Sequence, residues 1–137
     1  MYLLDTDVIS ELRRPRPHGA VVAWLESVTD SDLHLCAATL GEIQASIELA
    51  RDRDAAMAQE TDRWADKIAA SCNVLSMDAE TFRIWARLMP RRSDTLYEDA
   101  MIAATAKRHK LTVVTRNVRD FSLFAVALFN PFNAKSR

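Results

Sequence analysis

Short apolar runs alternate with longer amphipathic stretches along the whole chain, and this alternation restricts the possible folds more than any other feature. Apolar runs of strand length separated by helical stretches are typical of a parallel sheet covered by helices. We predict strands at residues 2–5, 33–37, 73–76, 111–115 and 125–129. We predict helices at residues 7–13, 20–28, 40–51, 55–71, 79–88 and 95–109. The expected fold class is α/β, with more helix than strand.

The length and composition of the chain fit one globular domain. It has 137 residues, of which 49% are hydrophobic and 27% charged, and its two glycines and four prolines mark no linker. We therefore predict a single domain over residues 1–137. The formal net charge is only −1, yet basic residues cluster at 13–18, 91–92 and 107–110. A near-neutral sum can thus conceal an acidic pocket bordered by basic patches.

The two cysteines and the N-terminus indicate a cytoplasmic protein. Cys36 and Cys72 have neither CxxC nor zinc-site spacing, so we interpret them as reduced thiols of the core. No apolar run approaches the roughly 18 residues of a spanning helix, so we expect no membrane association. Asp5 also interrupts the N-terminal apolar run that a signal peptide would need.

Four acidic residues lie where predicted elements begin or end, namely Asp5, Glu42, Asp99 and Asp120. In an open parallel sheet the ligand site lies beyond the carboxyl ends of the strands, and this geometry would bring the four together. Gathered carboxylates repel one another by about 4 kcal/mol for a pair about 4 Å apart at an effective dielectric constant of about 20. A positive charge must therefore lie among them. Oxygen ligands in this number indicate Mg²⁺ or Mn²⁺, and such an ion indicates phosphate chemistry.

Two of these acids have a competing structural interpretation near the N-terminal ends of helices. Thr39 and Glu42 match the capping box, in which the glutamate only completes a helix terminus. Either Thr6 or Asp7 could cap the helix that follows Asp5. Asp5 itself is harder to explain in this way, because the last inward position of a strand rarely carries an unpaired acid.

The other two acids belong to the C-terminal half of the chain. Asp99 leads a helical face that is otherwise apolar and small, and a carboxylate there is costly unless it is paired or binds a metal. Asp120 could be the third residue of a short helical turn capped by Asn117. Alternatively, Thr115 and Asn117 are hydrogen-bonding groups that orient a water molecule or a carboxylate.

Taken together, four segments resemble the PIN-domain ribonucleases, specifically the VapC toxins of bacterial toxin–antitoxin pairs. These segments are residues 3–9, 39–43, 99–106 and 115–121, and the ending Asn130-Pro131-Phe132 is similar to the FitB-like branch of that family. The resemblance runs from residue 2 to about residue 132. It implies a three-layer α/β/α sandwich with a small, mostly parallel sheet, and a Mg²⁺- or Mn²⁺-dependent endoribonuclease.

The resemblance also implies roles for individual residues. The acidic positions of the family correspond to Asp5, Glu42, Asp99 and Asp120, and Thr115 is the usual hydroxyl partner. We expect Asp5 and Asp99 to bind the metal directly, and Glu42 and Asp120 to bind it or to hold its water molecules. A metal-activated water would then attack the phosphodiester and leave 5′-phosphate and 3′-hydroxyl ends. Relatives often have asparagine at position 7, so Asp7 leaves the number of metal ions open.

The expected partners are an RNA substrate, a VapB-like antitoxin and a second copy of the chain in a homodimer. Apolar anchors of the antitoxin would fill a groove near residues 7–13 and 40–51, and a basic side chain would reach towards Asp5, Glu42 and Asp99. Arg13, Arg14 and Arg116 are candidates for holding the RNA backbone. The three tryptophans lie in apolar helical stripes, which favours packing in the core over base stacking.

Three alternative interpretations compete with this one. A catalytically silent PIN-like domain could serve only as a binding module. A phosphatase of the haloacid dehalogenase type would use Asp5-Thr6-Asp7 as its nucleophile motif, but neither its late Gly-Asp motif nor its phosphate-binding lysine is evident. A phosphoacceptor receiver module needs an acid that ends the third strand and a later Lys-Pro pair, and both are missing from the sequence.

Overall fold

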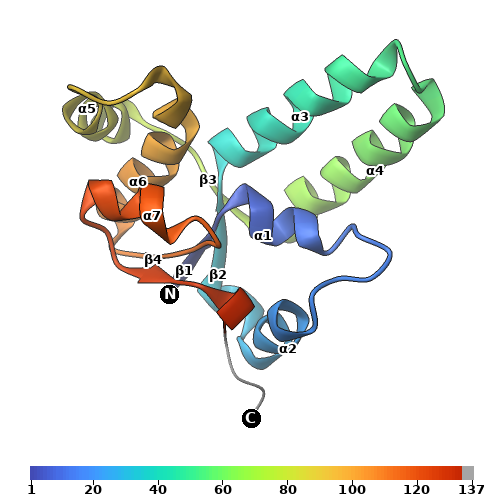
Figure 1. The fold of residues 1–137 in the computed structure, drawn as a ribbon, viewed down its shortest axis with the longest axis horizontal. Coiled ribbons are helices and arrows are strands. Elements are labelled where there is room, and N and C mark those ends of the chain that lie inside the picture. The colour runs from blue at the N-terminus through green and yellow to red at the C-terminus, as the bar shows by residue number, and fades with distance from the viewer. Residues whose placement is uncertain (134–137) are drawn as a thin grey trace.

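Five short parallel strands form the centre of a computed structural model that describes residues 1–133 (Figure 1). The strands are β1 (Tyr2–Leu4), β2 (Leu33–Cys36), β3 (Asn73–Leu75), β4 (Thr112–Val114) and β5 (Leu128–Phe129). Their order across the sheet is β3-β2-β1-β4-β5, and all four pairings are parallel. Because β2 and β4 lie on opposite sides of β1, the connections reverse direction there. The carboxyl ends of β1 and β4 therefore flank the topological switch point, where ligands bind in such sheets.

Seven helices surround this sheet and account for most of the described chain. They are α1 (Thr6–Glu11), α2 (Gly19–Ser27), α3 (Ala37–Arg51), α4 (Ala55–Ser71), α5 (Ala79–Leu88), α6 (Tyr97–His109) and α7 (Val118–Phe121). Short 3-10 turns lie at Asp30–Asp32, Asp94–Leu96, Ser122–Phe124 and Pro131–Asn133. Within residues 1–133 we find no helix that combines the length and the apolar character needed to traverse a bilayer.

The two faces of the sheet contribute to two separate hydrophobic cores, because successive side chains of a strand point to opposite faces. Leu3 and Val113 pack with residues of α6 and α7, whereas Leu4 and Val114 pack with residues of α1 to α4. Figure 1 shows the resulting layers, with α5 and α6 on one side of the sheet and the α3–α4 pair on the other. The predicted three-layer α/β/α arrangement is thus confirmed. Trp24, Trp64 and Trp85 all pack against these cores, as expected.

Small residues determine how closely α6 approaches the sheet. Ala100, Ala103 and Ala106 are completely or almost completely buried and lie in the same core as Leu3 and Val113. Alanine carries little volume on this face, so the helix axis can lie near the strands. The N-terminal end of α6, which carries Asp99, is thereby brought to the same edge of the sheet as the end of β1.

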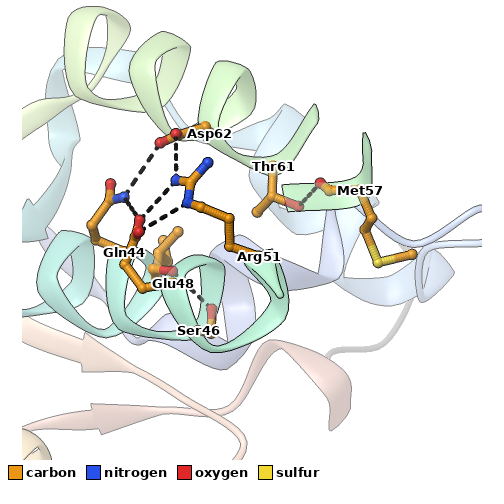
Figure 2. A network of polar contacts seen from close by, with 8 residues as sticks. Gln44, Ser46, Glu48, Arg51, Met57, Thr61 and Asp62 are labelled. Carbon is orange, nitrogen blue, oxygen red and sulfur yellow. Dashed lines mark hydrogen bonds and ion pairs between the residues drawn. The ribbon is translucent and has the colours of Figure 1, made fainter. Parts of the chain in front are cut away.

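Helices α3 and α4 form a hairpin that extends away from the sheet (Figure 1). A network of charged side chains joins them near the tip of the hairpin (Figure 2). Arg51 donates to both carboxylate oxygens of Glu48 at 2.9 and 2.8 Å, and to Asp62 of α4 at 3.1 Å. Gln44 donates to Glu48 at 2.7 Å. These groups are exposed or half-buried, so they define the geometry of the hairpin more than they stabilise the fold.

Most predicted elements exist, but several of their ends were placed wrongly. The predicted strand at residues 125–129 is shortened to β5 because Ala125 has a left-handed backbone (φ 53°), which ends the preceding turn and interrupts any strand. Cys36 is buried, Cys72 is half-buried, and both are free thiols, as predicted. The predicted domain spans 1–137, and its last four residues lie outside the described part of the chain.

Candidate functional site

Asp5 is the first residue after β1 and is only 6% exposed. Its Oδ1 accepts a hydrogen bond of 2.8 Å from the amide of Thr6, so Asp5 caps α1. Its Oδ2 accepts a hydrogen bond of 2.7 Å from the hydroxyl of Thr115, the residue that follows β4. The carboxylate is therefore held from two segments at the switch point. Neither Thr6 nor Asp7 is the cap of this helix, contrary to one sequence interpretation.

Asn117 connects the end of β4 to two further carboxylates. Its amide N–H donates to the hydroxyl oxygen of Thr115 at 2.9 Å. Its side-chain Nδ2 donates to Asp120 at 2.9 Å and to Asp99 at 3.4 Å. The side chain makes no capping bond to the backbone of α7. Asn117 occupies the N-cap position of α7 and Asp120 is the third residue of that helix, as one sequence interpretation predicted, but the side chain of Asn117 orients carboxylates, as the other proposed.

Glu42 reaches the same region from α3. The hydroxyl of Thr6 donates to Glu42 Oε1 at 3.1 Å and lies 3.3 Å from the hydroxyl of Thr39. The capping-box interpretation is wrong, because α3 begins at Ala37 and is capped by the sulfur of Cys36. Glu42 thus belongs to the second turn of the helix. Glu42 therefore does not cap the helix, and its side chain contacts Thr6 of α1.

Asp7 joins this group as a fifth acid. Its Oδ2 accepts a hydrogen bond of 3.3 Å from the backbone amide of Arg116. Its Oδ1 is buried and has no hydrogen-bond partner among the described residues. Burial, together with the adjacent negative charge of Asp5, raises the pKa of Asp7 to about 7. Such a buried, unpartnered carboxylate oxygen is suited to a cation.

The pKa values of the other acids show how close they lie to one another. Burial, together with the negative charges of Asp5 and Asp120, raises the pKa of Asp99 to about 6. The pKa of Glu42 is raised to about 7, mainly by burial; the hydrogen bond from Thr6 lowers the pKa, and the charge of Asp5 is a further cause of the net increase. For Asp5 itself, burial raises the pKa and the bond from Thr115 lowers it. Full ionisation of the group at neutral pH thus calls for a positive charge among these acids.

The donor set agrees chemically with a hard divalent cation. It consists of carboxylate oxygens supported by hydroxyl and amide groups, the set that Mg²⁺ and Mn²⁺ prefer. Among residues 1–133, no three acidic, histidine or cysteine side chains are already grouped in a metal-holding arrangement. Mg²⁺ commonly keeps several of its water molecules and binds one or two protein carboxylates directly. The chemistry of the group therefore fits the ion that the sequence resemblance implies.

Comparison of the sequence with models of protein families identifies the family of this chain. The model of the PIN domain matches residues 2–126, which is most of the chain. This chain belongs to the PIN domain family. Its five-stranded parallel sheet flanked by helices is thus the fold of a PIN domain.

Individual relatives resemble this PIN domain over nearly their full length. Toxin FitB of Neisseria gonorrhoeae is 34% identical over 139 residues, covering 97% of this chain and 99% of the relative. A VapC ribonuclease of Sinorhizobium fredii is 30% identical, covering 96% of this chain and 98% of the relative. The crystal structure of FitAcB from N. gonorrhoeae superimposes with a TM-score of 0.79 at 34% identity, covering 98% of this chain and 100% of that chain.

All five residues predicted to form the site of this PIN domain lie in the region described here. Thr6 and Asp7 also belong to this region. Sequence reasoning missed the role of Thr6, whose hydroxyl links α1 to Glu42. The available signal was its position directly after Asp5, at the start of a helix beside the switch point. Asp7 was known as an acid of uncertain role, and its unpartnered Oδ1 could be found only from the structure.

Proposed function

We propose that this PIN domain is an endoribonuclease toxin that hydrolyses RNA phosphodiester bonds and is neutralised by a cognate antitoxin. The observation that carries the proposal is the convergence of Asp5, Glu42, Asp99 and Asp120 on one edge of the sheet, with raised pKa values at Asp5, Glu42 and Asp99. Similarity to a VapC ribonuclease and to toxin FitB supports the substrate class and the biological role.

In this proposal, Asp5 and Asp99 would hold Mg²⁺ or Mn²⁺ directly, and Glu42 and Asp120 would hold the ion or its water molecules. When bound, such an ion lowers the pKa of a coordinated water and neutralises charge on the scissile phosphate. Thr115 donates to Asp5 and thereby favours its ionised form. Products with 5′-phosphate and 3′-hydroxyl ends are expected, as the family resemblance implies.

Asn117 has a positioning role in the same proposal. Its Nδ2 group donates to both Asp99 and Asp120, so it keeps two carboxylates directed at one region despite their repulsion. Its backbone amide is anchored by Thr115, which in turn donates to Asp5. The three carboxylates are thus linked through neutral donors that do not compete for a cation, and they are oriented before any ion arrives.

The direct test is an RNA cleavage assay with purified protein in Mg²⁺, in Mn²⁺ and in EDTA. Asp5→Asn and Asp99→Asn are each expected to lower the rate by about two orders of magnitude or more. Asp66→Asn is the matched control, because Asp66 is an exposed acid of α4. Undiminished cleavage by both site variants would refute the metal assignment. A wild-type protein that binds RNA without cleaving it would instead favour the catalytically silent binding module.

An antitoxin is expected because a free ribonuclease would damage its host. We propose that an apolar segment of the antitoxin occupies a groove of about 480 Å³. Residues of α1, α2, β2 and α4, and Leu12 directly after α1, line this groove; Ile9, Leu25 and Ile68 are among them. The sequence analysis predicted a groove near α1 and α3. Residues of α1 do line this groove, whereas α3 contributes none.

The occupant of the groove can be tested with the protein encoded by the neighbouring reading frame. Leu12→Arg places a charge in the groove and is expected to weaken binding of that partner without reducing RNA cleavage. Leu49→Arg is the control, because Leu49 is a 75% exposed leucine of α3 outside the groove. Equal binding by both variants would exclude the groove as the docking site.

Three further predictions accompany this proposal. We expect a homodimer, which light scattering of the purified chain tests directly. We expect residues 1–137 to behave as one folding unit, with a single unfolding transition. We also retain the cytoplasmic location as a prediction, which cell fractionation would test.

A further inference from the structure

Arg116 lies between the two residues that organise the acidic site, Thr115 and Asn117. Its backbone amide donates to Asp7, and its side chain is exposed. The guanidinium carbon lies 4.0 Å from the centroid of the Phe132 ring. Arg116 is therefore a cation whose backbone contacts Asp7 and whose sequence neighbours bind the other carboxylates, and its side chain contacts an aromatic ring.

The contact between Arg116 and Phe132 leaves the N–H groups of the guanidinium available to a ligand. An arginine beside several carboxylates is expected to pair with one of them. Within residues 1–133, however, Arg116 forms no salt bridge, and its side chain donates no hydrogen bond. An aromatic face holds a guanidinium without using its N–H groups, which remain available to a planar or tetrahedral anion.

Phe132 is itself held firmly at its position. The backbone amide of Phe132 donates to Asn130 Oδ1 at 3.0 Å, and Pro131 between them is buried. The ring of His18, directly before α2, lies with its centroid 5.2 Å from that of Phe132. Phe132 also packs against the core formed with α1 to α4. The Asn130-Pro131-Phe132 motif thus supplies a fixed ring under the guanidinium.

The other basic residues near the N-terminal segment are placed differently. Arg14 pairs with the buried carboxylate of Glu11 at 3.7 Å. Arg13 lies 5.1 Å from the ring of Trp64, but it follows the C-terminal end of α1, away from the acids at the N-terminal end of that helix. Arg116 alone among these three is adjacent in sequence to the residues that hold the carboxylates.

We propose that Arg116 binds a phosphate group of the RNA beside the acidic cluster, and that Phe132, held by the Asn130-Pro131-Phe132 motif, is the residue that positions it. This inference deepens the proposed function and rests on it. The acids repel the RNA backbone, so a cation at their edge is needed to bring a phosphate close to them. A planar guanidinium held in one orientation presents its N–H groups to the phosphate in a fixed direction, which a mobile surface cation does not.

The first experiment measures both cleavage and binding. Arg116→Ala is expected to raise KM roughly tenfold with a smaller change in kcat, because it removes a charge-assisted contact to substrate. In an Asp99→Asn background, where cleavage is blocked, the affinity for a labelled RNA is measured by anisotropy over a series of salt concentrations. The slope of log K against log salt is negative, and its magnitude is expected to decrease by about 0.7, which corresponds to the loss of one phosphate contact. Arg53→Ala is the control, since Arg53 lies near the tip of the α3–α4 hairpin.

The second experiment separates positioning from folding by a double-mutant cycle. Phe132→Leu is expected to raise KM in the wild-type background and to have no further effect on KM in the Arg116→Ala background. Arg116→Lys keeps the charge and is expected to retain the salt slope while losing part of the affinity. Phe82→Leu, at an exposed ring of α5, is the aromatic control. Melting temperatures of all variants are recorded, because a purely structural Phe132 would change stability rather than KM.

The outcomes distinguish this inference from the proposed function. If wild type cleaves RNA, Asp99→Asn does not, and Arg116→Ala keeps the wild-type KM and salt slope, then the inference is overturned and the ribonuclease proposal stands. If Phe132→Leu raises KM equally in both backgrounds, the positioning role of Phe132 is overturned. A wild-type protein that neither binds nor cleaves RNA overturns both proposals together.

Discussion

The hydroxyl of Thr115 donates a hydrogen bond of 2.7 Å to Oδ2 of Asp5, and this bond joins the ends of two neighbouring strands at the switch point of the sheet. The same hydroxyl oxygen accepts a hydrogen bond from the amide of Asn117. One buried side chain therefore connects β1, β4 and the turn before α7. It also favours the ionised form of Asp5, which burial alone would disfavour.

Replacing this hydroxyl is the first test of its importance. Thr115→Val keeps the volume but leaves a buried carboxylate oxygen and the Asn117 amide without their partner. We expect a loss of about 1–3 kcal/mol in the free energy of unfolding, and a large loss of RNA cleavage. Thr115→Ser retains the hydroxyl and should keep most of both quantities. Urea denaturation of the two variants, together with the cleavage assay, makes the comparison; equal stability of the two would show that the hydrogen bond is unimportant.

The pH dependence of stability follows from the raised pKa values. The pKa is about 6 for Asp99 and about 7 for Glu42 and Asp7, above the ordinary values of 3.8 for aspartate and 4.5 for glutamate. At pH values between the ordinary and the raised pKa values, the folded protein therefore binds more protons than the unfolded chain. In EDTA, the free energy of unfolding should fall as pH rises from about 4 to about 8 and then level off.

Variants of single acids identify which groups cause that dependence. Glu42→Gln should reduce the fall in stability over this pH range, because it removes one of the raised groups. Asp66→Asn, which changes an exposed acid on α4, should leave the pH profile unchanged. Denaturation curves collected across the range in EDTA measure this. A stability that rises with pH in metal-free protein would contradict the predicted repulsion.

Metal binding should stabilise the folded state by relieving this repulsion. At about 100 times its dissociation constant, Mn²⁺ is expected to add roughly 2.7 kcal/mol to the free energy of unfolding. Asp99→Asn should lose this gain, yet be at least as stable as the wild type in EDTA at pH about 8, where the acids repel most strongly. Thermal denaturation with and without Mn²⁺ tests both statements. An unchanged melting temperature of the wild type in saturating Mn²⁺ would rule out the site.

Asp5→Asn is expected to differ from Asp99→Asn in this measurement. Both oxygens of Asp5 accept hydrogen bonds, one from Thr6 and one from Thr115, whereas an asparagine offers only one acceptor oxygen. Relief of repulsion is therefore offset by a donor left without a partner, and Asp5→Asn should be the less stable of the two variants in EDTA. The same thermal series makes this comparison.

The packing of α6 against the sheet is also open to test. Ala103 is fully buried in the core that contains Leu3 and Val113. Ala103→Leu should lower the free energy of unfolding by about 1–3 kcal/mol, because no space exists for the larger side chain. It should also reduce cleavage, since displacement of α6 moves Asp99. Ala69→Leu at an exposed position of α4 is the control, with an expected change within about 0.5 kcal/mol. A tolerated Ala103→Leu would mean that α6 has room to move.

The sequence by itself determined the class of fold and the acids worth examining. The alternation of apolar runs with amphipathic stretches predicted five strands and six of the seven helices, because hydrophobic periodicity is a local property. Asp5 and Asp99 were recognisable as anomalies, since each interrupts an otherwise buried pattern. Helix ends were less predictable, and α3 shows why. Residues 39–42 match a capping box, but the helix begins at Ala37 because the buried Cys36 provides the cap.

Only the tertiary structure decided which side chains meet. Thr6 contacts Glu42 across 36 residues, Asn117 contacts Asp99 across 18, and Thr115 contacts Asp5 across 110. These contacts depend on the order β3-β2-β1-β4-β5, which places the ends of β1 and β4 side by side. Strand order arises from how several amphipathic helices share two faces of one sheet, and no single segment encodes it. The position of Arg116 over Phe132 depends on the same ordering, because β5 carries the C-terminal turn back to the switch point.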